Sequence, residues 1–239
     1  MNLDQQTRQS RDTSFRHQPP GVEEPLVIIV DDDDAVREAL SELIGSAGFQ
    51  VACFASTRDL LHAEVLDRPG CLILDVRMPG ASGLDLQNHL VQAGTVKSVI
   101  FLTGHGDIPM SVQAMKAGAA DFLTKPVRDQ TLLDAVIAGI ATDAERRMEA
   151  AVVLRNVRRM ETLTPREREV LHEVARGRLN KQIAFDLGIS EVTVKLHRGN
   201  VMRKMEVRSI GELIRAWETL PAALRQPPSD PNRSPPAGA

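Results

Sequence analysis

The stretch VIIVDDDDAVREAL, residues 27–40, decides the fold of the first half of the chain. It begins with an apolar run that is too short for a helix, passes through four consecutive aspartates, and continues with apolar residues at helical spacing. Further short apolar runs follow, each bounded by Gly, Pro, Asp or Ser. We therefore expect five strands, at these ranges: Leu26–Val30, Gln50–Phe54, Cys71–Leu74, Ser98–Leu102 and Ala120–Leu123.

Helical spacing fills the gaps between these runs, for example at Val36, Leu40 and Leu43 and again at Val112 and Met115. Strands that alternate with helices in this way predict a doubly wound α/β fold with a five-stranded parallel sheet. The runs are almost continuously apolar, as expected for strands that are buried on both faces. We assign residues 25–140 to this domain.

Polar residues follow four of the expected strands at their carboxyl ends. Asp31 and Asp32 follow the first strand, Asp75 the third, Thr103 the fourth and Lys125 the fifth. Because ligands of open parallel sheets bind beyond the carboxyl ends of the strands, we expect these side chains to converge. A single aspartate after a strand is usually a turn or helix cap. We keep that interpretation for the next two aspartates, one of which should cap the following helix.

The chemistry of this set favours phosphoryl transfer. Three carboxylates cannot share a small cleft without neutralisation, and Mg²⁺, a hard cation that keeps several waters, suits them best. Asp75 could attack a phosphoryl group as a nucleophile and form an aspartyl phosphate. Mg²⁺ and Lys125 would stabilise the transferring oxygens, and Thr103 could donate a hydrogen bond to the bound phosphoryl group.

Three segments resemble the receiver domains of two-component response regulators: VIIVDDDDAVREAL (27–40), LILDVRMPGASGLDL (72–86) and FLTGHGDIPMSVQAMKAGAADFLTKP (101–126). The third segment is most similar to the FixJ type. The gaps between Asp32, Asp75, Thr103 and Lys125 are 43, 28 and 22 residues, which match the family frame. The resemblance implies a CheY-like receiver fold.

The resemblance also implies roles for single residues. It implies Asp75 as the phosphoacceptor, with Asp32, Asp75 and the backbone carbonyl of Arg77 as direct Mg²⁺ ligands. Asp31 would assist, through water.

It further implies Thr103 and Phe122 as a conformational switch pair and Lys125 as the phosphate-binding lysine. The peptide bond between Lys125 and Pro126 would be cis. Taken alone, Phe122 would be a core residue, and we interpret His105 as a loop residue.

Residues 141–160 contain helix formers and mixed charge without Gly or Pro, which predicts a helical linker. From 161 to 220 the pattern is wholly helical. Thr164 and Glu167 predict a capping box, and Gly188 separates a short helix from a longer one that Ser190 caps. Two helices joined by such a turn indicate an all-α helix-turn-helix domain.

The segment LTPREREVLHEVARGRLNKQIAFDLGISEVTVKLHRGNVMRKM, residues 163–205, resembles the LuxR-type module of NarL/FixJ regulators. The recognition helix would begin near Glu191 and face the major groove. The candidate DNA contacts are Lys181, Thr193, Lys195, His197, Arg198 and Arg203. By comparison with the family, Lys195 is the best candidate for reading bases. Gly199 stands where many relatives carry a basic or polar group, so this chain lacks the side chain for one base contact that the resemblance would imply.

Charge is distributed unevenly along the 239 residues, whose formal net charge is −3. Residues 25–140 carry 15 acidic and 8 basic side chains, whereas residues 155–220 carry 9 acidic and 14 basic ones. The basic half makes nucleic acid a candidate partner. With one Trp and no Tyr, binding of single strands by aromatic stacking is disfavoured.

Neither membrane insertion nor secretion is indicated. No apolar run approaches the roughly 18 residues of a membrane span, and the N-terminus lacks a signal-peptide core, so we expect a cytoplasmic protein. Cys53 and Cys71 lie in apolar runs and should be reduced and buried. Residues 1–24 are polar and residues 221–239 are rich in Pro, so both segments should be disordered.

These patterns predict a phosphorylation-dependent transcription regulator and not an enzyme. A cognate histidine kinase would phosphorylate Asp75, a homodimer would form, and the C-terminal domain would bind double-stranded promoter DNA. A phosphohydrolase of the haloacid dehalogenase type would also use Asp75, but Arg77 stands where those enzymes carry a second Asp. A constitutive DNA-binding protein with a vestigial receiver is a third interpretation, which the full set of site residues disfavours.

Overall fold

The computed structural model describes residues 23–95, 97–104 and 107–226. The chain forms two compact units, one ending at Asp143 and the other beginning at Ala144. His105, most of the N-terminal extension and the last part of the Pro-rich tail lie outside the described residues. Among the described helices, none combines the length and the apolar character that crossing a membrane requires.

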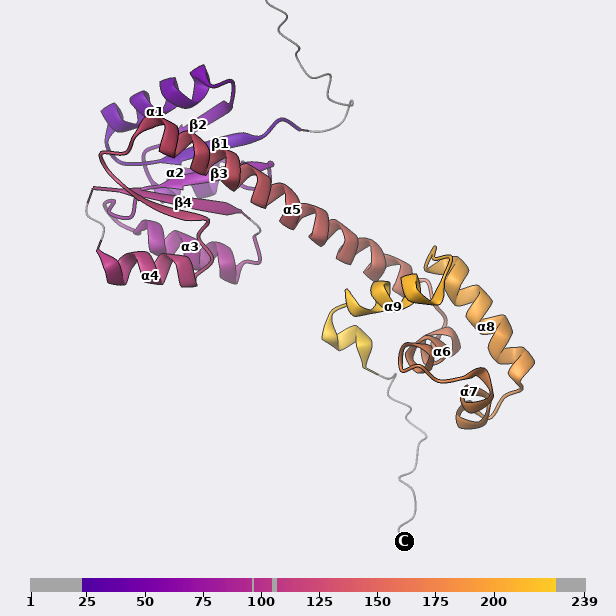
Figure 1. The fold of residues 1–239 in the computed structure, drawn as a ribbon. Helices are drawn as coiled ribbons and strands as arrows, with labels where there is room; N and C mark the ends of the chain where they lie inside the picture. The colour runs from indigo at the N-terminus through magenta and orange to yellow at the C-terminus, as the bar shows by residue number, and fades with distance from the viewer. Residues whose placement is uncertain (1–22, 96, 105–106, 227–239) are drawn as a thin grey trace, which may run out of the picture. The chain divides into compact units, whose positions relative to one another are not determined.

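The first unit contains a parallel sheet with the strand order β2-β1-β3-β4-β5 (Figure 1). Its strands are β1 (Leu26–Val30), β2 (Gln50–Phe54), β3 (Gly70–Leu74), β4 (Ser98–Thr103) and β5 (Asp121–Thr124). All five predicted strands are present, with ends that differ by at most one residue. The doubly wound α/β fold is confirmed.

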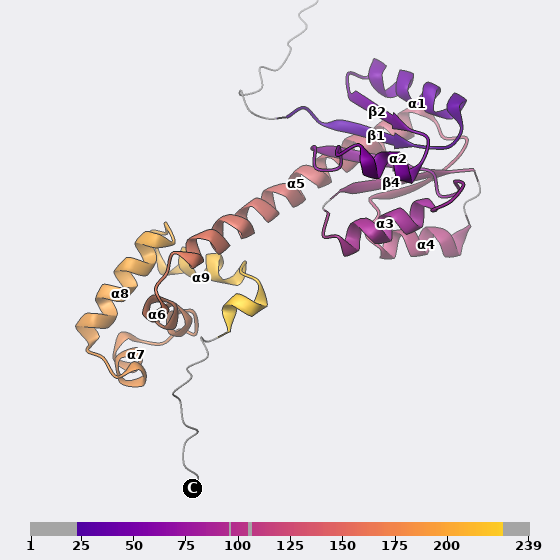
Figure 2. The ribbon, with the colours of Figure 1, turned by 180° about the vertical axis from the view of Figure 1, so that it is seen from behind.

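Helices cover both faces of this sheet (Figure 2). They are α1 (Asp34–Ser46), α2 (Thr57–His62), α3 (Gly83–Gln92), α4 (Ile108–Lys116) and α5 (Asp129–Glu161). One core cluster joins the sheet to α2, α3 and α4, and a second joins its other face to α1 and α5. Asp33 caps α1, because its side chain accepts hydrogen bonds from two backbone amides of the first turn.

The two cysteines have different environments, which corrects the prediction that both are buried. Cys71 lies on the central strand β3, and burial raises the pKa of its thiol to about 12. Cys53 lies on β2, one of the two edge strands of the sheet, and is exposed. The apolar run around Cys53 resembles a buried strand, but the edge position leaves part of it uncovered.

The segment predicted as a helical linker is the second half of one long helix. α5 is continuous from Asp129 to Glu161. Its first half packs closely on the sheet at Gly139, where an added Cβ would lie 3.1 Å from Ile100 and 3.2 Å from Cys71. At the end of the first unit, the buried Asp143 accepts a hydrogen bond from the backbone amide of Gly70, at 3.0 Å.

The second unit is helical. It contains the end of α5, then α6 (Pro165–Ala175), α7 (Asn180–Leu187), α8 (Glu191–Lys204), α9 (Ile210–Glu218) and a short 3-10 helix, η1 (Ala222–Arg225). Thr164 and Glu167 form the predicted capping box of α6. The 3-10 turn corrects the prediction of disorder from residue 221 onward, because the regular backbone extends to Arg225.

Candidate functional site

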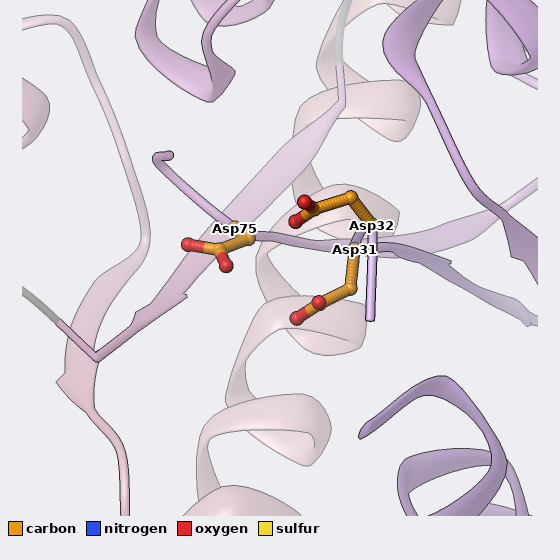
Figure 3. A group of neighbouring side chains, drawn as sticks. All are labelled: Asp31, Asp32 and Asp75. Atoms are coloured by element: carbon orange, nitrogen blue, oxygen red, sulfur yellow. The ribbon is translucent and has the colours of Figure 1, made fainter. Parts of the chain in front are cut away.

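Three carboxylates lie together at the carboxyl end of the sheet. Asp31 and Asp32 follow β1, and Asp75 follows the neighbouring strand β3 (Figure 3). One carboxylate oxygen from each residue lies within 4.8 Å of the other two. Asp31 and Asp75 are buried, whereas Asp32 is exposed. The parallel pairing of β1 with β3 sets this arrangement, because it brings the residues that follow Val30 and Leu74 to the same edge.

Lys125 balances part of this negative charge. Its Nζ donates a hydrogen bond to Asp31 Oδ2 at 2.5 Å and another to Asp75 Oδ2 at 3.2 Å. Burial acts to lower the pKa of Lys125, but the hydrogen bonds and charges of Asp31 and Asp75 outweigh it, so the pKa is raised. The lysine therefore carries its positive charge across the physiological pH range.

Thr103 and Phe122 lie on the two strands next to Lys125, at the carboxyl edge of the sheet or just before it. The peptide bond between Lys125 and Pro126 is cis, as predicted. The Lys125 amide donates a hydrogen bond to the carbonyl of Thr103, at 2.8 Å, and Thr103 itself is buried at the end of β4. Phe122 is half-buried on β5 and packs against Phe101, with ring centroids 6.0 Å apart.

The backbone after β3 folds around Asp75. The amide of Arg77 donates a hydrogen bond to Asp75 Oδ1, at 3.2 Å, which fixes the loop that contains the Arg77 carbonyl. Gly83, which sequence reasoning missed, begins α3 against this loop. A Cβ at Gly83 would lie only 2.2 Å from the Asp75 carbonyl oxygen. The available signal is a glycine, a poor helix former, in the first turn of a helix that Ser82 caps.

α7 and α8 form the predicted helix-turn-helix. Gly188 ends α7 in the left-handed conformation, and Ser190 caps α8 by accepting a hydrogen bond from the amide of Thr193. Val194, Val201 and the following Met205 are buried, as expected from their spacing. α8 therefore presents its remaining faces away from the core of the second unit.

The candidate DNA contacts fall into two groups. Lys181, Lys195 and Arg203 are exposed. Thr193, His197 and Arg198 are half-buried, and their side chains lie partly against other residues of the second unit. The Thr193 hydroxyl lies 2.8 Å from that of Ser190. The Arg198 guanidinium donates a hydrogen bond to Asn180, and so links α8 to α7. His197 has a buried Nδ1 with no hydrogen-bond partner among the described residues.

Sequence reasoning missed two apolar residues on the same helix. Val192 and Leu196 are 76% and 63% exposed. They lie four residues apart, so they share one face of α8. Such side chains suit contact with the methyl groups of thymine. Their positions could have been recognised from the sequence. On a helix, Val192 and Leu196 do not share the face of the core residues Val194, Val201 and Met205, so they are expected to be exposed.

Comparisons with known proteins agree with both halves of the chain. The family model of the response regulator receiver domain matches residues 27–137. A second model, described as bacterial regulatory proteins of the luxR family, matches residues 161–217. Nodulation protein W of Bradyrhizobium diazoefficiens is 50% identical over 196 residues, 82% of this chain and 86% of that protein. The chain belongs to the response regulators.

Two further similarities cover the receiver domain and the DNA-binding domain together. Response regulator protein TodT of Pseudomonas putida is 50% identical over 199 residues, 83% of this chain and 88% of TodT. The solved structure of response regulator StyR has a TM-score of 0.71 at 47% identity, covering 82% of this chain and 98% of StyR. This response regulator is therefore a transcription regulator controlled by phosphorylation, and not an enzyme.

Proposed function

We propose that this response regulator accepts a phosphoryl group on Asp75 from a cognate histidine kinase. The observation that carries the proposal is the position of Asp75, which lies beside two further carboxylates and within hydrogen-bonding distance of Lys125. In the transfer, a carboxylate oxygen of Asp75 forms a bond to phosphorus while the bond from phosphorus to the donor nitrogen breaks. Lys125 offsets the negative charge of the phosphoryl oxygens.

The acidic cluster fits Mg²⁺, the ion that receiver domains generally bind at such a site. Asp31, Asp32 and Asp75 supply hard oxygen donors, and one oxygen of each lies within 4.8 Å of the others. The backbone carbonyl of Arg77 would complete the protein ligands. Bound there, the ion would neutralise charge that Lys125 alone leaves uncompensated.

The test of this proposal is to locate the phosphoryl group. Purified protein is incubated with acetyl phosphate and Mg²⁺, and the modified peptide is identified by mass spectrometry. We expect a single modification on the peptide that contains Asp75. A label on Asp32, or on a residue outside the cluster, would contradict the assignment.

Phosphorylation would promote pairing of two receiver domains. The switch residues Thr103 and Phe122 precede and follow α4 in the chain. α4 presents an exposed apolar row at Ile108, Val112 and Met115, which are 80%, 45% and 47% exposed. Covering such a row removes apolar surface from water, and this stabilises a dimer.

We expect light scattering to give mainly the monomer mass without a phosphoryl donor and the dimer mass with acetyl phosphate and Mg²⁺. An unchanged mass at full labelling would contradict phosphorylation-linked dimerisation.

The C-terminal domain would bind double-stranded promoter DNA with α8 in the major groove. Lys195 lies in the first half of α8 and is exposed, so it can reach base edges. A lysine that bonds to guanine acceptors discriminates against other bases by about 1–3 kcal/mol. Lys195→Ala should therefore weaken specific binding and relax the preference at one position of each half-site.

Arg203 lies further along α8 and should contact a phosphate. Arg203→Ala should weaken binding to all sequences equally and lower the slope of the salt dependence by about one. Binding to one site and its single-base variants, at several salt concentrations, separates the two roles. Arg58→Ala, an exposed arginine of α2 in the receiver domain, serves as the control. If Lys195→Ala weakens every variant equally, another residue of α8 reads the bases.

A further inference from the structure

α3 connects the backbone of Asp75 to the end of α4 through two residues on one face. Gly83, in its first turn, lies against the Asp75 carbonyl, and its amide donates a hydrogen bond to the Val76 carbonyl at 3.1 Å. Gln87 follows four residues later, so both residues lie on the same side of the helix. The Gln87 side chain is buried, with 2% exposed.

Gln87 donates two hydrogen bonds at the end of α4, one to its last turn and one to its C-cap residue. Its Nε2 lies 3.3 Å from the carbonyl oxygen of Ala114 and 3.3 Å from that of Ala117. The last carbonyls of a helix lack partners within that helix and need donors from elsewhere. The Ala114 carbonyl also accepts a hydrogen bond from the backbone amide of Ala119, at 3.1 Å, so Gln87 gives it a second donor. Gln87 also donates to the carbonyl of Ala117, the C-cap residue that follows α4. The position of the last turn of α4 therefore depends on α3.

Packing alone does not account for a glutamine at this position. The Oε1 atom of Gln87 is buried and has no hydrogen-bond partner among the described residues. A buried acceptor without a partner is costly, and an apolar side chain of similar length would fill the space without that cost. The feature that distinguishes glutamine here is its amide, which reaches a carbonyl in the last turn of α4 and that of its C-cap residue.

The end of α4 that Gln87 contacts lies close in the chain to the residues that phosphorylation is expected to move. α4 follows the strand that ends at Thr103, and only four residues lie between Ala117 and Phe122 in the chain. The outer face of the same helix carries the apolar row Ile108, Val112 and Met115. Any change in the Asp75 loop that displaces the first turn of α3 therefore acts on α4 at Ala114 and Ala117.

We propose that Gln87 is a positioning residue that couples the Asp75 loop to α4 through α3, separately from Thr103 and Phe122. The inference rests on the proposed phosphorylation and dimerisation, and it adds a second connection between them. Coupling of this kind is established by measuring an equilibrium at both ends, because contacts alone do not demonstrate it.

The test uses the full chain with Gln87→Met, which keeps the length of the side chain and removes both donors. Gln87→Leu is a second variant, in case the first folds poorly. Gln92→Met, at the exposed end of α3, is the matched control. For each protein, labelling by acetyl phosphate is quantified. The dimer dissociation constant is then measured with and without the donor, together with hydrogen exchange of the Gly118 and Ala119 amides.

We expect Gln87→Met to take up the label as the wild type does. The ratio of the two dimer dissociation constants should fall about fivefold to tenfold, the size expected for losing one or two neutral hydrogen bonds. Exchange at Gly118 and Ala119 should become faster and lose its response to the donor. Gln92→Met should match the wild type. A merely structural role would lower the melting temperature of Gln87→Met but leave the ratio unchanged.

An unchanged ratio and an unchanged exchange response in Gln87→Met and Gln87→Leu would overturn the inference. If the wild type itself fails to dimerise, the proposed function fails at that step, and the exchange response alone then decides on Gln87.

If neither variant folds, hydrogen exchange in the wild type decides. An exchange rate at Gly118 and Ala119 that does not respond to labelling would overturn the coupling, and a clear response would support it.

Discussion

Asp75→Asn should abolish labelling by acetyl phosphate in the presence of Mg²⁺. An amide has no anionic oxygen with which to attack phosphorus. The neighbouring carboxylates are poor substitutes, because Asp31 is buried against Lys125 and Asp32 is exposed at the rim of the cluster. Intact-mass spectrometry after a fixed incubation gives the labelled fraction directly. We expect the variant to remain at the background of a sample without donor.

The loss of label should not come with a loss of stability. Asp75→Asn removes one of three crowded carboxylates, so repulsion within the cluster falls. The melting temperature in Mg²⁺-free buffer should therefore be equal to or higher than that of the wild type. Asp134→Asn, an exposed carboxylate on α5, is the control and should label normally. Labelling of Asp75→Asn at the wild-type rate would contradict the role of Asp75.

Features that depend on residues close together in the chain were predictable from the sequence. The strands lie within one residue of their predicted ends, because each short apolar run is bounded by turn residues. The caps at Asp33, Thr164 and Ser190 are also local, since each side chain bonds to amides two or three residues ahead. The acidic cluster followed from one general property of parallel sheets, that their carboxyl ends share one edge.

Features that depend on contacts between distant segments were not predictable. The exposure of Cys53 depends on β2 being an edge strand, and no spacing within the run reveals the strand order. Gln87 bonds to carbonyls 27 and 30 residues away, and nothing in its own helix indicates that this polar side chain is buried. Among the DNA candidates, the partner of Arg198 lies 18 residues earlier, in α7.

The role of Gly83 also depends on a contact between distant segments. After Asp75→Asn, replacing Gly83 should have the largest effect on the rate of labelling. In Gly83→Ala the added Cβ would lie 2.2 Å from the Asp75 carbonyl oxygen and 2.9 Å from Leu74 Cγ. The carbonyl is backbone at the end of a central buried strand and cannot rotate away. α3 or the Asp75 loop must therefore shift by about 1 Å, and a displacement of that size at a reacting group costs on the order of 100-fold in rate.

We therefore expect Gly83→Ala to label about 100-fold more slowly than the wild type at equal acetyl phosphate and Mg²⁺. Gly45→Ala is the matched control, because Gly45 lies within α1 of the same domain and an added Cβ meets nothing within 4 Å. That variant should label normally and gain about 0.5–1 kcal/mol of stability, since alanine favours the helix. Circular dichroism of Gly83→Ala separates a displaced loop from an unfolded domain. A folded Gly83→Ala protein that labels at the wild-type rate would show that the close approach of α3 does not position Asp75.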